Sequence, residues 1–438
     1  MKPRRAHVYL LTSVLALPAL ASAQERPSRP FRGLFGGGLG DTEQVLTVSF
    51  GAVGGRDVVS TDAPEGTLVS GVPVGSSTFG SWNGQATYGV SRARFGLTAS
   101  ATAYSRYSAD ESEPIARSAS ATGRWLVLKH TTLSAGAQTV HQPLSVLSFF
   151  PGLPVGGVDR STLASYTLGN VPNIYVSDQG QIGLAQQLTR RSTMSVGYSY
   201  QRANFAQVAG ARDVQTGAID FSHQLTRSLT LRAGYQESSS SYGVDETTGD
   251  TLWFQNRTIN AGVDYSGSLT LSRRTTLAVS TGSALISDRV TRRFRLTGNA
   301  ILRREIGRSW DLNLSYDRQA GFIQTLREPV FTDSLTSSLN GLLARRVSVY
   351  SSFGLAGGSV GFRSSMNGYK AYHGGAGVSM ATSRYLSFRV SYSYYRFEAD
   401  NPQLLPLGLG LLSRHGIVAG VDVFTPIIAR ARRGNAAR

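Results

Sequence analysis

The sequence predicts an all-β protein, and within that class a transmembrane, antiparallel, up-and-down β-barrel of about 18 strands, with 16 strands as the alternative. The first observation is a short arginine-containing cap that recurs along the chain, for example at 188–193, 225–230, 271–276 and 343–348. The second is that each cap separates two stretches in which apolar and small polar residues alternate. The third is that no apolar run approaches the about 18 residues that a transmembrane helix needs. One long β-hairpin per repeat is therefore the predicted unit.

The start of the chain has the features of a secretory signal peptide. Arg4 and Arg5 supply positive charge, residues 8–20 form an apolar run, and residues 21–23 read Ala-Ser-Ala, a cleavage site. We expect four regions, which are the signal peptide at 1–23, a flexible periplasmic segment at 24–43, the barrel at 44–426 and a basic tail at 427–438.

The composition excludes several classes of function. The chain has 44 Lys and Arg against 27 Asp and Glu, a formal net charge of +17, and no cysteine. Without cysteine there is no disulfide or thiolate chemistry. A basic chain can bind nucleic acid, but the arginines of this chain are spread over the expected turns and strands, and no nucleic-acid motif is present. We therefore expect no nucleic-acid partner.

The strands are expected from alternation with a period of two, because a barrel wall has one apolar and one polar face. In 386–394, for example, Phe388 and Val390 fall on one face and Ser387 and Arg389 on the other. The expected strands are 44–54, 81–90, 95–105, 117–128, 131–141, 174–188, 192–204, 214–225, 229–240, 255–271, 275–287, 291–303, 309–320, 333–344, 347–358, 371–381, 385–397 and 413–424. Each cap follows an even-numbered strand, so the caps and both chain ends lie on one side and the longer loops on the other.

The hairpins also predict which residues face each other. If the turn near Gly307 is tight, Leu302 faces Leu312 on the outside and Arg303 faces Asp311 on the inside. A soluble β-sandwich, solenoid or propeller is the alternative architecture. A sandwich would rarely need nine similar hairpins, and a propeller would show a blade motif, which is absent.

With this pattern the chain resembles a Gram-negative outer-membrane β-barrel of porin-like size, over residues 44–424. The last strand, 415–424, is similar to the terminal assembly signal of such barrels, because Gly420 and Phe424 stand where a glycine and a terminal aromatic occur. It differs in continuing into a tail at 425–438. The resemblance implies a location in the bacterial outer membrane after cleavage of the signal peptide.

A barrel of this size leaves an aqueous channel unless something fills it. The inferred inner face carries Ser, Thr, Gly, Asn and Gln with scattered charges, so the lumen is hydrophilic and slightly basic and would favour anions or polar neutral solutes. The alternative is that each Arg is paired with an Asp across a hairpin. The pore-lining candidates are Arg124, Arg232, Asp264, Arg293, Arg295, Arg303, Asp311, Asp317, Arg389 and Asp422.

The longest expected loop, 142–173, is a second candidate site, because long loops are often functional. Its apolar segment supplies the constriction-loop candidates Leu147, Phe149, Phe150 and Leu153. The third loop of general porins folds inward to narrow the channel, and this loop resembles it in place and length. The alternative is an extracellular loop that packs on its neighbours.

The sequence predicts no enzyme, no cofactor and no metal site. The histidines are scattered, and the metal and thiol motifs HExxH and CxxC do not occur. The serine-hydrolase pattern GxSxG is matched once, at 357–361, but no helix is expected after it. We therefore recognise no set of catalytic residues in the sequence.

The leading functional hypothesis is an outer-membrane channel for passive or gated passage of hydrophilic solutes such as ions and saccharides. The alternatives are an export barrel for a polysaccharide or other polymer, working with a periplasmic protein partner, and a structural or adhesion barrel without a pore. The expected partners are outer-membrane lipid and the solute or polymer. Caps such as Arg190-Arg191 and Arg345-Arg346 form a basic rim, which either contacts phospholipid head groups or docks an acidic periplasmic partner.

Overall fold

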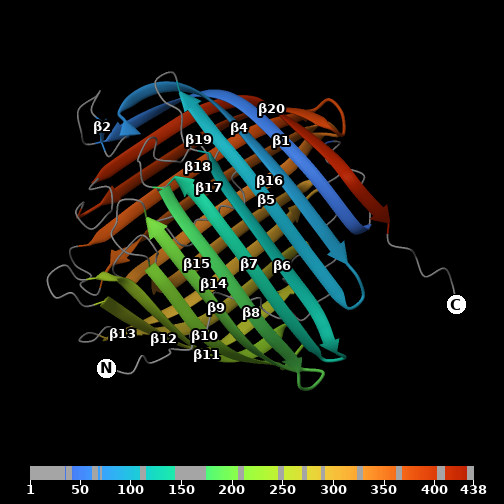
Figure 1. Ribbon diagram of the computed structural model, residues 1–438, viewed down its shortest axis with the longest axis vertical. Coiled ribbons are helices and arrows are strands. Elements are labelled where there is room, and N and C mark those ends of the chain that lie inside the picture. The colour runs from blue at the N-terminus through green and yellow to red at the C-terminus, as the bar shows by residue number, and fades with distance from the viewer. Residues whose placement is uncertain are drawn as a thin grey trace, which may run out of the picture.

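Eighteen strands form one closed antiparallel barrel in the computed structural model (Figure 1). The structure describes residues 35, 42–61, 68–69, 72–108, 115–143, 174–205, 212–244, 251–268, 274–287, 292–322, 329–361, 367–401 and 410–431. The ring closes because β1 (Thr42–Thr61) pairs with both β20 (Leu411–Ala431) and β4 (Gly75–Ser91). None of the described segments is a helix long and apolar enough to cross a membrane. The expected architecture and strand count are confirmed.

The remaining barrel strands follow one another around the wall in chain order. They are β5 (Phe95–Ser108), β6 (Ala116–Leu128), β7 (Thr131–Pro143), β8 (Ile174–Gln187), β9 (Ser192–Phe205), β10 (Arg212–Gln224), β11 (Leu229–Val244), β12 (Thr251–Ser268), β13 (Thr275–Ser287), β14 (Arg292–Ile306), β15 (Trp310–Phe322), β16 (Pro329–Ala344), β17 (Val347–Val360), β18 (Gly368–Ala381) and β19 (Leu386–Ala399). The short strands β2 (Leu68–Val69) and β3 (Val72–Pro73) form a separate two-stranded sheet.

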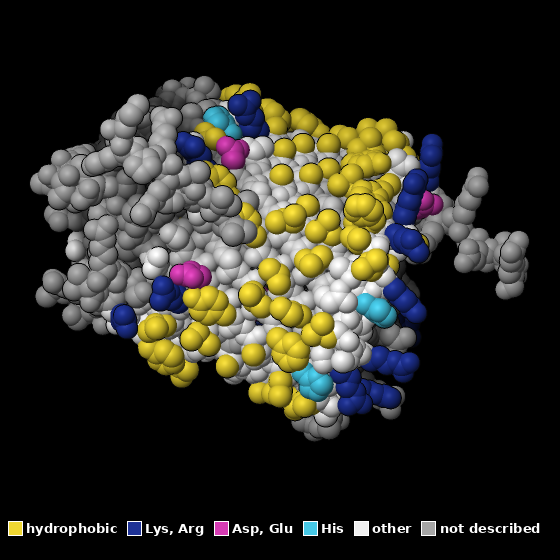
Figure 2. All heavy atoms as spheres, turned by 60° about the horizontal axis from the view of Figure 1, so that its bottom comes forward, with side chains coloured by type: hydrophobic (Ala, Val, Ile, Leu, Met, Phe, Trp, Pro, Cys, Tyr) yellow, Lys and Arg dark blue, Asp and Glu magenta, His cyan; other side chains and the backbone are white. Residues whose placement is uncertain are grey.

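The wall has an apolar outer face and a polar inner face. In β19 the side chains of Phe388 and Val390 are 44% and 51% exposed, whereas those of Ser387, Arg389 and Ser391 are buried. The same alternation runs around the ring, and Figure 2 shows the result as hydrophobic side chains spread over the outer surface, bordered at one edge by Lys and Arg. We call that edge, where the short hairpin turns lie, the turn end, and the opposite edge the loop end.

Each expected strand overlaps one strand of the barrel, but several strands are longer than expected. β1 continues to Thr61 rather than 54, β4 begins at Gly75 rather than 81, and β20 continues to Ala431, so the expected boundary of the barrel at 426 is too early. The physical reason is that β1 and β20 pair from Thr42↔Ala431 to Thr61↔Leu412, and each added residue extends the ladder of backbone hydrogen bonds. The glycines of β1 interrupt the apolar alternation and hide its continuation.

The hairpin of β14 and β15 corrects the expected residue partners. Leu302 pairs with Leu314 rather than Leu312, and Asp311 pairs with Glu305 rather than Arg303. The turn spans 307–309 and holds Gly307 at φ 63°, a left-handed conformation that glycine adopts without strain. The centre of the hairpin therefore lies beyond Gly307. The shift is by two residues, which leaves every side chain on its expected face.

Candidate functional site

Much of the inner face of the barrel is a polar surface held together by hydrogen bonds between neighbouring strands, although Val53, Phe79 and Val418 form a buried apolar cluster on the same face. The Ser100 and Ser120 hydroxyls lie 2.8 Å apart, and those of Thr102 and Ser118 lie 2.6 Å apart, across the seam of β5 and β6. These cross-strand pairs satisfy hydroxyl groups that would otherwise depend on water. The lumen wall is thus rigid and hydrophilic, which suits contact with a polar solute.

The strand registers place all ten pore-lining candidates on this inner face. Their exposure divides them, since Arg124 and Arg303 are exposed, Arg389 is buried and the others are half-buried. The Arg303 side chain is 60% exposed and the Arg389 side chain only 5%. Arg124 and Arg303 are therefore more accessible than Arg389.

Three of the candidate arginines face a carboxylate on an adjacent strand or the same hairpin. The separations are 3.7 Å for Arg232–Asp264, 3.5 Å for Arg303–Asp311 and 3.4 Å for Arg389–Asp422. The pairing alternative therefore describes these arginines. Arg303 and Asp311 form this ion pair diagonally, although their backbones are not opposite each other.

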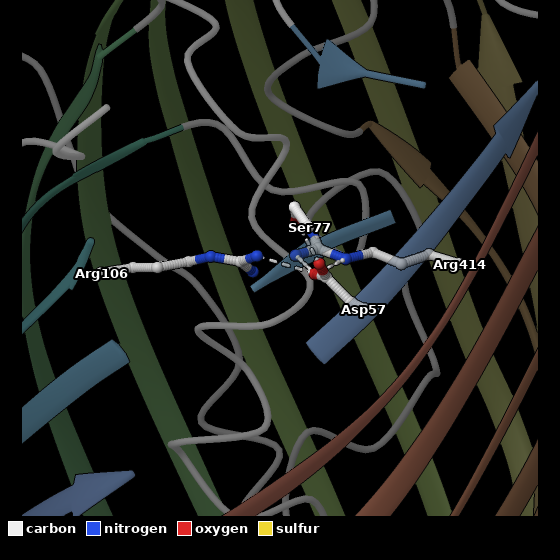
Figure 3. Close-up of polar contacts among 4 residues, drawn as sticks. All are labelled: Asp57, Ser77, Arg106 and Arg414. Carbon is white, nitrogen blue, oxygen red and sulfur yellow. Dashed lines mark hydrogen bonds and ion pairs between the residues drawn. The ribbon is translucent and has the colours of Figure 1, made fainter. Parts of the chain in front are cut away.

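A buried charge cluster that the sequence did not indicate lies at the loop end of the inner face. Asp57 of β1 accepts hydrogen bonds from Arg106 of β5 at 2.7 Å, from Arg414 Nε of β20 at 2.9 Å and from Ser77 of β4 at 2.6 Å (Figure 3). The Arg106 guanidinium also lies 3.7 Å from the ring centroid of Phe79, a cation–π contact. One carboxylate thus ties four successive strands together where the barrel closes.

The electrostatics of this Asp57 cluster are those of a fixed, nearly dry site. Asp57 is 1% exposed, and the side chains of Arg106 and Arg414 are 7% and 10% exposed. Among the contacts of the described residues, two guanidiniums share the one carboxylate of Asp57. Because buried charges need full pairing, its first role is to hold the wall closed.

The sequence reasoning missed this cluster because of strand length. Asp57, Ser77 and Arg106 all lie just beyond the expected strands 44–54, 81–90 and 95–105. Extending the period-two alternation by three positions beyond 54 and by one position beyond 105 would have placed Asp57 and Arg106 on the inner face. The signal was present, but glycines and small polar residues weakened it.

The constriction-loop candidates lie outside the described residues. β7 ends at Pro143 and β8 begins at Ile174, and Leu147, Phe149, Phe150 and Leu153 fall between them. Their role stays a prediction. Among the described residues, no group of His, Cys, Asp and Glu side chains could hold a metal ion.

Comparison with known proteins adds little beyond the general shape. No protein-family model and no curated protein matches the chain. Solved structures similar to it include Pseudomonas aeruginosa OpdQ, with 10% identity and a TM-score of 0.45 over 88% of this chain and 98% of that one. Acinetobacter baumannii OccAB4 has 11% identity and a TM-score of 0.47 over 89% of this chain and 100% of that one. The siderophore receptor PirA from Pseudomonas aeruginosa has 9% identity and a TM-score of 0.42 over 87% of this chain and 80% of that one.

Proposed function

We propose that the protein is an outer-membrane channel for hydrophilic solutes. The observation that carries this proposal is the closed 18-stranded wall with an apolar outer face and a polar inner face. Only a membrane makes an exposed apolar band favourable all around a barrel, and the ladder between neighbouring strands satisfies the backbone groups that it pairs. A barrel of this size is wide enough for a water-filled lumen. The features support transport rather than catalysis.

The location in the outer membrane is part of this proposal. The turn end would face the periplasm and the loop end the exterior, which is the usual arrangement of bacterial barrels. The predicted signal peptide at 1–23, which export requires, lies outside the described residues. Its cleavage stays a prediction.

The exposed arginines of the lumen should set the ion preference of the channel. Reversing Arg124 and Arg303 together to Glu should shift permeability from anions toward cations, because both side chains are exposed on the inner face. The measurement is the reversal potential of protein in a planar bilayer under a KCl gradient. The matched control reverses Arg94, an exposed arginine in the turn before β5, and should leave the potential nearly unchanged. An unchanged potential in the lumen variant would remove Arg124 and Arg303 from the conduction path.

A second candidate function is favoured by the cations at the turn end. These exposed residues are Arg92, Arg94, Lys129, Arg190, Arg191, Arg227, Arg274, Arg304, Arg308, Arg345, Arg346, Arg384 and Arg430. Figure 2 shows Lys and Arg along this edge of the apolar surface. A basic ring of this kind would dock an acidic periplasmic protein, as an export barrel for a polysaccharide or other polymer requires.

If the protein is an export barrel, loss of the basic ring should lower the amount of polymer at the cell surface without changing the single-channel conductance. Charge reversal to Glu at Arg190, Arg191, Arg345 and Arg346 should lower the polymer at the cell surface several-fold, because the docking ring loses its charge complementarity. Single-channel conductance of the same variant in a planar bilayer should stay at the wild-type value, since none of these residues lines the lumen. Normal surface polymer in cells carrying the variant would assign the ring to lipid head groups instead.

A further inference from the structure

The ladder between β14 and β15 ends at the loop end of the wall before either strand does. Their pairing ends at Gly298↔Arg318, although β14 continues to Arg292 and β15 continues to Phe322. Each of these two strands stays paired with its other neighbour. β13 pairs with β14 as far as Arg292, and β16 pairs with β15 as far as Phe322. The ladder between β12 and β13 is also interrupted, between Ile259 and Tyr265, but it resumes on both sides of that irregularity. Pairing of β5 with β6 also stops early, but there β6 itself begins, at Ala116. At the β14–β15 seam both strands continue, and they separate.

Side chains cross the wall at this break. By strand alternation Arg295 belongs to the inner face of β14 and Asp333 to the outer face of β16, yet Arg295 donates to Asp333 at 2.6 Å. Asp333 also accepts from the outer-face Tyr316 hydroxyl at 2.9 Å and lies 3.4 Å from Arg318. A contact between opposite faces is possible here because no hydrogen-bonded ladder stands between the two strands.

An aromatic ring lies with these charges. Phe331, which alternation also assigns to the outer face of β16, is fully buried, and its ring centroid lies 4.1 Å from the Arg293 guanidinium and 5.5 Å from that of Arg295. Beside them on the outer face, Phe294 and Leu296 are each 64% exposed. The break therefore combines three guanidiniums, one carboxylate and an exposed apolar strip.

We propose that this break is a lateral binding site for a single-chain anionic amphiphile, such as a fatty-acid anion. The head group would replace Asp333 on Arg295, with Arg293 and Arg318 adding positive charge, and the acyl chain would lie along Phe294 and Leu296. In a bilayer, unpaired backbone groups of 292–297 on the β15 side are costly, and a bound carboxylate with its hydration offsets that cost. The proposal rests on the membrane location of the barrel and not on passage of solutes through its lumen.

The first arm of the test measures the break itself. The chain has no cysteine, so an introduced pair reports without background. Leu302 and Leu314 are opposite each other in the paired part of the same two strands, and the pair L302C/L314C should oxidise readily. Leu296 and Ala320 lie two positions beyond the last pair, Gly298↔Arg318, and would face each other if the ladder continued. The pair L296C/A320C should therefore oxidise at least several-fold more slowly. Equal oxidation rates would show a continuous wall and overturn the proposal.

The second arm measures the ligand in phosphatidylcholine vesicles. A fluorophore on A320C should be quenched several-fold more by a nitroxide-labelled stearate anion than by its neutral methyl ester. The substitutions Arg293→Gln and Arg295→Gln together should abolish that preference. The matched control is Arg257→Gln, because Arg257 also pairs with an acid that accepts from a tyrosine, but it lies where β11 and β12 stay paired. A label on S239C, at that continuous seam, should show no preference.

Two results of the vesicle measurement would also overturn the proposal. One is equal quenching of A320C by the anion and the ester, and the other is the same anion preference at S239C as at A320C. A barrel that conducts ions but gives either result would leave the channel function standing and remove the lateral site alone.

Discussion

The substitution Asp57→Asn should destabilise the barrel by about 3–5 kcal/mol, because it removes the buried carboxylate that two guanidiniums share. Asp57 is the shared acceptor of Arg106, Arg414 and Ser77, and it ties β20, β1, β4 and β5 together at the closure of the wall. The measurement is the free energy of unfolding from reversible urea titrations of protein folded in lipid vesicles, followed by tryptophan fluorescence.

The matched control is Asp311→Asn, at the other end of the wall. Its ion pair with Arg303 spans 3.5 Å, and the two side chains are 38% and 60% exposed, so we expect a loss of only about 0–1 kcal/mol. The double variant D57N/R414Q should lose less than the sum of its two single losses, because one of the two guanidiniums that share Asp57 is gone. Equal losses for D57N and D311N would contradict the structural role of the Asp57 cluster.

The substitution Ile219→Arg should cost about 2–4 kcal/mol, since it places a cation on the membrane face near the middle of a strand. Ile219 is 50% exposed on the outer face of β10, where it pairs with Val196 and Tyr235. The adjacent residue Ala218 faces the lumen, and Ala218→Arg should cost much less, because water can solvate the new guanidinium. Both free energies come from the same vesicle titration. A cost for A218R that equals or exceeds that of I219R would contradict the assignment of the two faces.

The faces of this barrel were predictable from sequence, because each depends only on the alternation within one strand. Phe388 and Arg389 fall on the faces that alternation assigns, and so do Arg303 and Asp311. The partner of each residue was not predictable, since it depends on the length of the turn. A turn of three residues after Ile306 displaces every pair of that hairpin by two positions.

The Asp57 cluster and the break between β14 and β15 could not be predicted from the sequence, for different reasons. The Asp57 cluster joins residues from four strands, and no local pattern relates Asp57 to Arg414 on the last strand. The break beside β14 was missed because alternation continues through Arg293, Phe294 and Arg295 as if the strand were fully paired. The alternation predicts which face of the sheet a side chain occupies, but it does not predict whether a neighbouring strand is paired at that position.

The central claim is a closed barrel with a water-filled lumen in a membrane, and single-channel recording of the protein in a planar bilayer tests it most directly. We predict discrete, stepwise ionic currents from protein whose heat-dependent gel mobility shows it to be folded. Folded protein that inserts into the bilayer but passes no current would contradict the open channel.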